Sequence, residues 1–135
     1  MTESPSGPAT RPLSPHLLHW RWHITMLCSI LHRATGLALY GGALILAAWA
    51  ICLASGPGAY ADFRVILGSL IGKLALFGLT VSIFYHLAGG VRHLVWDSGH
   101  GYQPKIADLT GVACIAFGIV AAAAVWIIAG MTGGL

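Results

Sequence analysis

Charged residues are scarce in this sequence. Asp, Glu, Lys and Arg together make up 8% of its 135 residues, four of these residues are acidic, and 57% of the chain is hydrophobic. Soluble domains contain about 25% charged residues, so this composition excludes an ordinary soluble domain. The formal net charge of +3 comes from scattered basic residues that indicate no basic groove, and we expect no nucleic-acid partner.

Paired cysteines and an early apolar segment are also missing. Cys28, Cys52 and Cys114 lie far apart without a CxxC or CxxCH pattern, which gives no support for a disulfide, structural zinc or covalently bound c-type haem.

No apolar run precedes position 24, which argues against a secretory signal or transit peptide. We therefore interpret residues 1–25, with four prolines between positions 5 and 15, as a cytoplasmic arm and interfacial segment. A bacterial inner membrane is favoured over the mitochondrial inner membrane.

What the chain does contain is three long stretches without Asp, Glu, Lys or Arg, at residues 34–61, 74–91 and 109–135. Each reaches the roughly 18 to 20 residues that cross a hydrocarbon core about 30 Å thick. The sequence predicts an all-α membrane protein whose domain, residues 26–135, has three transmembrane helices at about 26–53, 63–94 and 106–131. Gly and Pro in the connections at 55–62 and 95–105 predict turns and antiparallel neighbours.

The distribution of basic residues predicts the orientation, because positive charge is retained on the cytoplasmic side of a membrane. The predicted cytoplasmic side has five basic residues and the other side has two. We therefore expect a cytoplasmic N-terminus. The five are Arg11, Arg21, Arg33, Arg92 and Lys105, and the two are Arg64 and Lys73.

A histidine inside the second predicted span is the first candidate for function. His86 lies six residues before Arg92, roughly 9 Å deeper in the membrane. An imidazole at that depth needs a hydrogen-bond partner or a metal. Gly89 and Gly90 fall on its helix face and leave space for a flat ligand such as a porphyrin. The alternative is a hydrogen-bonded packing histidine with small residues at a helix contact. His93 lies at the interface and is equally compatible with a structural role.

The segment SILHRATG, residues 29–36, lies at the same membrane side of the first span. His32, Arg33 or Arg92 could meet anionic haem propionates, and Ser29 and Arg33, which are i, i+4 neighbours, could donate hydrogen bonds to a quinone carbonyl. The alternative is a positively charged anchor that follows a serine at the helix start.

These segments resemble a known family. RPLSPHL at residues 11–17, SILHRATG at 29–36 and YHLAGGVRHLVWD at 85–97 resemble, in order, the cytochrome b subunits of succinate dehydrogenase, respiratory complex II. The resemblance implies a three-helix anchor that packs with a second membrane-anchor subunit, shares one haem b with it, and joins iron–sulfur and flavoprotein subunits. The chain would then be a non-autonomous subunit of succinate:quinone oxidoreductase, with ubiquinone as substrate.

The resemblance also implies roles for individual residues. His86 would be this chain's axial ligand to haem iron, and the partner anchor would supply the other ligand. His32 and Arg33 would lie near the propionates, and Ser29 and Arg33 would contact ubiquinone. Arg92, His93 and Asp97 match the same family segment, whereas His19 and His23 are not assigned a role.

Two other functions remain to be weighed. One is a haem-free structural anchor whose polar groups serve packing and docking only. The other is a small transporter with Lys73, His86 and Arg92 along its path. The transporter is disfavoured because the predicted membrane centres contain no acidic residue and no inverted repeat is visible.

Overall fold

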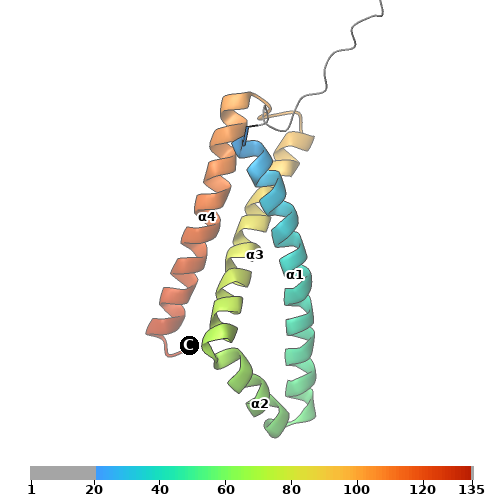
Figure 1. Ribbon diagram of the computed structural model, residues 1–135, viewed down its shortest axis with the longest axis vertical. Helices are drawn as coiled ribbons and strands as arrows, with labels where there is room; N and C mark the ends of the chain where they lie inside the picture. The colour runs from blue at the N-terminus through green and yellow to red at the C-terminus, as the bar shows by residue number, and fades with distance from the viewer. Residues whose placement is uncertain (1–20, 135) are drawn as a thin grey trace, which may run out of the picture.

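A computed structural model describes residues 21–134, which form four helices and contain no strand. These are α1 (Ile24–Ser55), α2 (Pro57–Gly68), α3 (Leu70–Asp97) and α4 (Pro104–Met131). Figure 1 shows α3 between α1 and α4, with the short α2 at the end where α1 finishes. The prediction of an all-α protein is confirmed. The RPLSPHL segment, His19 and the rest of residues 1–20 lie outside the described residues.

Three of the helices are long and apolar enough to cross a membrane. They are α1, with 32 residues, and α3 and α4, with 28 each. At about 1.5 Å per residue, even 28 residues extend about 42 Å, beyond a hydrocarbon core of about 30 Å. The predicted number of transmembrane helices is therefore confirmed. The predicted first and third spans, 26–53 and 106–131, lie within α1 and α4.

The second span, predicted at residues 63–94, is wrong at its start. Residues 57–68 form α2, and α3 begins at Leu70, so most of the segment expected as a loop at 55–62 is helical. Pro57 is tolerated as the first residue of α2, because a backbone N–H at that position would have no hydrogen-bond acceptor within the helix. The break follows from Ser69, whose hydroxyl accepts from the backbone N–H of Gly72 at 3.1 Å and caps α3.

Gly72 makes this break sterically possible. A Cβ at position 72 would lie 2.5 Å from the carbonyl oxygens of Ile66 and Leu67. The end of α2 and the first turn of α3 therefore approach so closely that a side chain at position 72 does not fit.

Small residues also bring α3 and α4 together. The buried residues of α4 are Ala107, Gly111, Gly118 and Ala122. A Cβ at Gly118 would lie 2.8 Å from the Cβ of Tyr85 and 3.1 Å from its Cα, so the two backbones pack closely. Such contacts are typical of helices in a bilayer, where close packing replaces hydrophobic burial as the source of association.

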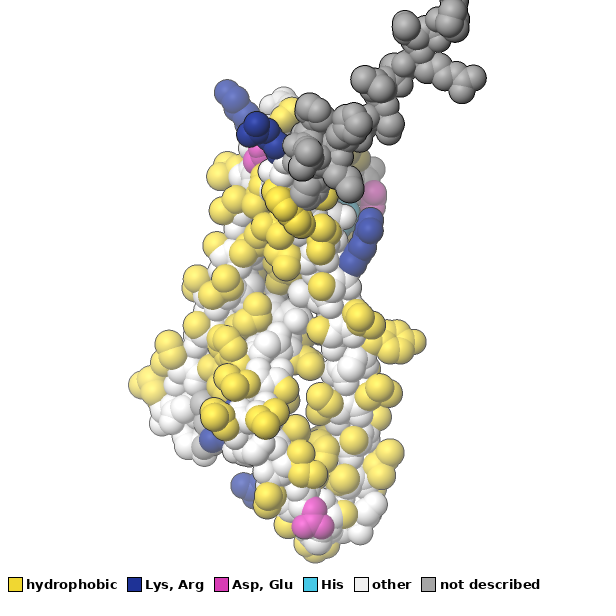
Figure 2. All heavy atoms as spheres, in the orientation of Figure 1, with side chains coloured by type: hydrophobic (Ala, Val, Ile, Leu, Met, Phe, Trp, Pro, Cys, Tyr) yellow, Lys and Arg dark blue, Asp and Glu magenta, His cyan; other side chains and the backbone are white. Residues whose placement is uncertain are grey.

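The outside of the bundle is apolar. Leu37, Tyr40 and Leu44 on α1 are 77%, 77% and 68% exposed, and Cys28 is the one buried residue of that helix. Figure 2 shows hydrophobic side chains over the length of the visible face and charged side chains at its two ends. This surface suits lipid or another membrane helix, and not water.

The two ends of the bundle are distinct. We call the end where α1 and α4 begin and α3 finishes the histidine end, because His32, His86 and His93 lie toward it. The opposite end, with α2, the start of α3 and the last turns of α1 and α4, is the α2 end (Figure 1). Which end faces the cytoplasm stays a prediction from the basic residues.

Candidate functional site

Three imidazole rings from two helices gather at the histidine end. His32 of α1 stacks on His86 of α3, with ring centroids 3.9 Å apart and planes inclined by 19°. His93 contacts His32 edge-on at a centroid distance of 5.0 Å. The sequence predicted His32 and His86 for different parts of a haem site, and the structure places them in direct contact.

Two glycines create room for this pair. A Cβ at Gly36 would lie 3.1 Å from Cε1 of His86, and a Cβ at Gly89 would lie 2.5 Å from Cδ2 of His32. Gly90 faces open space. The sequence interpretation that Gly89 and Gly90 both leave a gap beside His86 is therefore wrong. Gly89 accommodates His32, and the glycine beside His86 comes from the other helix.

The ring of His86 is held by a residue that the sequence analysis did not single out. Nδ1 of His86 lies 3.2 Å from Oγ1 of Thr35 on α1. The same hydroxyl donates to the backbone carbonyls of Leu31 and His32, 2.8 and 3.0 Å away. Thr35 lies inside the SILHRATG segment, and its spacing of three residues from His32 was the available signal.

His32 has an unsatisfied nitrogen. Its Nε2 is buried and has no hydrogen-bond partner among residues 21–134. Buried polar atoms are nearly always hydrogen-bonded, so an orphaned one calls for an explanation, such as a ligand. His93 differs, because its Nδ1 bonds the carbonyl of Gly89 within the same helix at 2.9 Å.

Arg92 is engaged within the chain. Its Nε donates to Oγ1 of Thr110 at 3.0 Å and one terminal nitrogen donates to the carbonyl of Ala107 at 2.7 Å, which joins α3 to α4. The guanidinium carbon also lies 3.9 Å from the ring centroid of Trp96. A guanidinium has five N–H donors, so these bonds leave others free. The predicted propionate contact of Arg92 stays a prediction.

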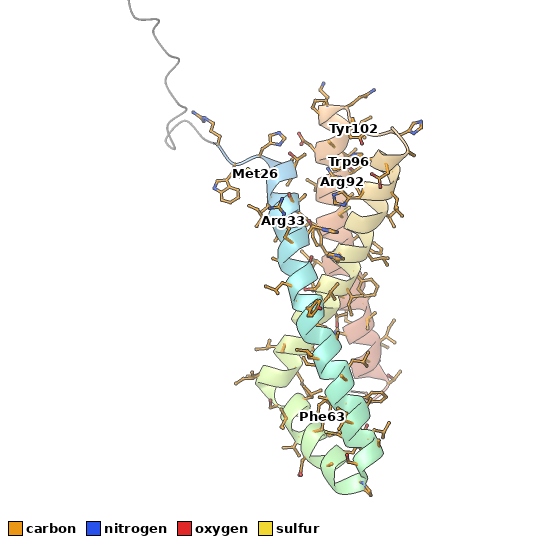
Figure 3. All side chains as sticks on the ribbon, turned by 90° about the vertical axis from the view of Figure 1, so that its right-hand side faces the viewer. Met26, Arg33, Phe63, Arg92, Trp96 and Tyr102 are labelled. Atoms are coloured by element: carbon orange, nitrogen blue, oxygen red, sulfur yellow. The ribbon has the colours of Figure 1, made fainter. Side chains whose placement is uncertain are left out.

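Ser29 and Arg33 have the opposite character. Both side chains are exposed, and neither makes a hydrogen bond or ion pair with another residue of the described chain. Figure 3 shows Arg33 toward the end of the bundle that also contains Arg92, Trp96 and Tyr102, with Phe63 toward the other end. Since they are one helical turn apart, Ser29 and Arg33 offer donors on the same side of α1.

A cavity of about 100 Å³ lies between α1, α3 and α4 at this end. Its lining includes Ser29, His32, Tyr85, Arg92 and His93, but not Arg33. Pockets that enclose small-molecule ligands are typically about 300–1,000 Å³, so this cavity alone is too small for a large ligand. Within residues 21–134, no group of three or more His, Cys, Asp or Glu side chains is arranged to hold a metal ion.

Comparison with known proteins decides the family. The family described as succinate dehydrogenase/fumarate reductase transmembrane subunit matches residues 8–125. The chain belongs to this family.

Its relatives include bacterial and mitochondrial members. The succinate dehydrogenase cytochrome b556 subunit of Rickettsia felis is 38% identical over 117 residues, which cover 87% of this chain and 91% of the relative. The corresponding b556 subunit of Paracoccus denitrificans is 37% identical over 112 residues, or 83% and 86% of the two chains. The mitochondrial cytochrome b560 subunit of Mus musculus is 35% identical over 114 residues, or 83% and 68%.

In this family member, the predicted site residues divide into two groups. His86, Arg92 and His93 already have partners within the chain. Ser29, Arg33 and Nε2 of His32 have none among the described residues. Of the residues without an assigned role, His23 caps α1 and lies 3.6 Å from the Asp108 carboxylate. Lys73 lines a separate cavity at the α2 end.

Proposed function

We propose that this chain is the membrane-anchor cytochrome b subunit of a succinate:quinone oxidoreductase and that it helps to bind haem b and ubiquinone. The observation that carries the proposal is the pair of His32 and His86 between two membrane helices, in a chain of the succinate dehydrogenase/fumarate reductase transmembrane family. The haem is shared with a second membrane-anchor subunit. Iron–sulfur and flavoprotein subunits complete the enzyme, so this chain has no complete active site of its own.

The residues of the histidine end fit a haem. Imidazole is a common axial ligand of haem iron, and His86 has Nδ1 held by Thr35 while Nε2 makes no hydrogen bond within the described chain. His32, with its buried unpaired Nε2, and Arg33, with its unpaired guanidinium, can bind anionic propionates. Arg92 has donors left for the same purpose. When bound, the haem supplies a one-electron carrier close to the quinone.

Ser29 and Arg33 are the proposed ubiquinone contacts. A hydroxyl and a guanidinium without partners in the described chain can donate to a quinone carbonyl, and the positive charge favours the negative charge that develops on its oxygen during reduction. Two electrons from succinate, oxidised on the flavoprotein subunit, and two protons convert ubiquinone to ubiquinol. Ser29 lines the cavity of about 100 Å³ and Arg33 does not, so neighbouring subunits would have to complete the quinone site.

The exposed apolar side of α1 supports a membrane partner as well as contact with lipid. Leu37, Tyr40 and Leu44 form a stripe at helical spacing and are each at least 68% exposed. We place the assembly in a bacterial inner membrane, with the histidine end and the N-terminus on the cytoplasmic side. The excess of basic residues and the bacterial relatives support this placement.

Substitution of His86 tests the proposal. A reduced-minus-oxidised visible spectrum of the purified complex should show a b-type haem in the native enzyme and lose it in His86→Ala. His100→Ala is the matched control, because His100 is exposed and its ring is hydrogen-bonded to the Ser98 hydroxyl, away from His32 and His86. A native complex without haem would instead favour a structural anchor. A native spectrum in His86→Ala would reject the ligand assignment.

A further inference from the structure

One hydroxyl group connects α1 to the proposed haem ligand on α3. Oγ1 of Thr35 lies within hydrogen-bond distance of three groups: the carbonyl oxygen of Leu31 at 2.8 Å, that of His32 at 3.0 Å and Nδ1 of His86 at 3.2 Å. A threonine hydroxyl has one proton to donate and two lone pairs to accept with. The two carbonyls can only accept, so they compete with Nδ1 for that single proton.

The distances favour the carbonyls in this competition. The Thr35 hydroxyl is closer to the Leu31 carbonyl, at 2.8 Å, than to Nδ1, at 3.2 Å, and donation to the carbonyl four residues earlier is the usual bond of a threonine within a helix. The oxygen then accepts from the imidazole, which requires the proton of a neutral His86 on Nδ1. The lone pair of the ring is consequently on Nε2.

The ring is also fixed in position. The His32 ring covers one face with centroids 3.9 Å apart, and the α1 backbone at Gly36 approaches Cε1 so closely that a Cβ there would be 3.1 Å away. Stacking limits tilting of the imidazole, and the bond to Thr35 limits its rotation about χ2.

We propose that Thr35 is a positioning residue that holds His86 with its proton on Nδ1 and its Nε2 lone pair available to haem iron. This inference rests on the proposed function, in which His86 is the axial ligand. Metal-ligating histidines usually donate their second nitrogen's proton to an acceptor, which fixes the tautomer and increases the basicity of the ligating nitrogen. Here the acceptor comes from the neighbouring helix, so haem binding depends on how α1 and α3 are aligned.

The test compares Thr35→Val with Thr35→Ser in the purified complex. Valine keeps the branched shape of threonine but removes the hydroxyl, whereas serine keeps the hydroxyl. We expect Thr35→Val to weaken haem retention about 10- to 100-fold, which is the usual effect of losing such a partner, and Thr35→Ser to stay close to the native complex. Retention is measured as the haem remaining per complex after dilution in detergent.

Two further readouts report the ligand itself. Loss of the hydrogen bond should change the midpoint potential of the haem and the g-values of the oxidised haem in electron paramagnetic resonance, which depend on the orientation of the axial imidazole. Thr80→Val is the matched control. Thr80 makes the same bond to the carbonyl four residues earlier, at 2.8 Å, but its cross-helix contact is Trp126 and not a histidine. Thr80→Val should leave haem retention, potential and g-values unchanged.

The outcomes separate this inference from the proposed function. Loss of haem in His86→Ala together with native haem properties in Thr35→Val would overturn the role of Thr35 alone. Haem that persists in His86→Ala would overturn both. Equal haem loss in Thr35→Val and Thr35→Ser would show that the hydroxyl is not what matters. If Thr35→Val does not assemble, Thr35→Ala replaces it, because alanine removes the hydroxyl without adding bulk. A native haem in Thr35→Ala would then reject the inference.

Discussion

The two ends of this bundle are built on different principles. At the histidine end, polar side chains link the helices: Thr35 bonds His86, Tyr85 donates to the carbonyl of Cys28 at 2.8 Å, and Arg92 bonds Thr110 and Ala107. Toward the α2 end, α3 and α4 share a bond from Trp126 to Thr80, but α1, α2 and α3 enclose an open groove of about 490 Å³, lined by side chains such as Leu46, Phe63 and Leu79.

The glycines of the two ends differ in part. Gly36, Gly89 and Gly111 at the histidine end each lie against a side chain of another helix, with a built Cβ 2.5 to 3.1 Å from it. Toward the α2 end, Gly58, Gly68 and Gly78 meet nothing within 4 Å, whereas Gly72 lies against the backbone of α2 and Gly42 against the side chain of Leu79. Apolar contacts between helices add little stability in a bilayer, because the lipid that they replace is itself apolar. Polar bonds between helices therefore define the helix positions where we place the chemistry, whereas the open groove toward the α2 end leaves room for lipid.

The largest effect that would sharpen this comparison is expected from the arginines of the two ends. Arg33→Gln removes an unpaired charge beside Ser29. Arg64→Gln removes a charge at the α2 end, where the guanidinium carbon lies 6.0 Å from the ring centroid of Tyr60. Hydrogen bonds to charged groups contribute about 1.5–3 kcal/mol, so we expect Arg33→Gln to slow quinone reduction about 10- to 100-fold. Arg64→Gln should have little effect.

The measurement compares succinate oxidation with ubiquinone and with a soluble electron acceptor in the same preparations. The soluble acceptor bypasses the quinone site, so its rate should not change in either variant. Parallel losses with both acceptors in Arg33→Gln would indicate damage to assembly, and equal effects of the two arginines on quinone reduction would remove the functional distinction between the ends.

A smaller effect is expected from adjacent glycines on α3. Gly89→Ala would push a Cβ against the His32 ring, which is confined by His86 and His93, whereas Gly90→Ala faces open space. Overpacking of this kind lowers the free energy of unfolding by about 1–3 kcal/mol. We expect a lower thermal unfolding temperature and a perturbed haem spectrum for Gly89→Ala, with native behaviour for Gly90→Ala. Similar results for both variants would contradict the close packing of His32 on α3.

The sequence predicted the membrane helices well because length and lack of charge are local properties. It missed the break at Ser69, since a Ser cap inside an apolar run does not lower the hydropathy, although Gly68-Ser69 followed by Gly72 was a usable signal. The contact between His32 and His86 was out of reach for a different reason. It depends on the register between α1 and α3, which periodicity within one helix does not define.

Arg92 shows the same limit in a single residue. The sequence placed it near the other polar residues at the end of the second span, and it lines the same cavity as Ser29 and His32. Its bonds to Ala107 and Thr110 were not foreseen, because they require α4 to pack against this part of α3. A basic residue near a predicted anion site can therefore be largely occupied in holding helices together.

The smallest effect is expected for Trp126→Phe, which removes a polar link between α3 and α4 toward the α2 end. Trp126 donates from Nε1 to Oγ1 of Thr80 at 3.1 Å and contacts the Phe77 ring edge-on at 5.5 Å. Phenylalanine keeps an aromatic contact, and Thr80 keeps its own bond to the Leu76 carbonyl, so no hydroxyl proton is left unpaired. Hydrogen bonds between membrane helices average about 0.6 kcal/mol, and we expect a loss of that order in the unfolding free energy of the complex, with an unchanged haem spectrum. A haem change as large as that of Gly89→Ala would mean that the α2 end controls the spacing of α1 and α3 around the histidines, and the two ends would then have to be treated as one coupled unit.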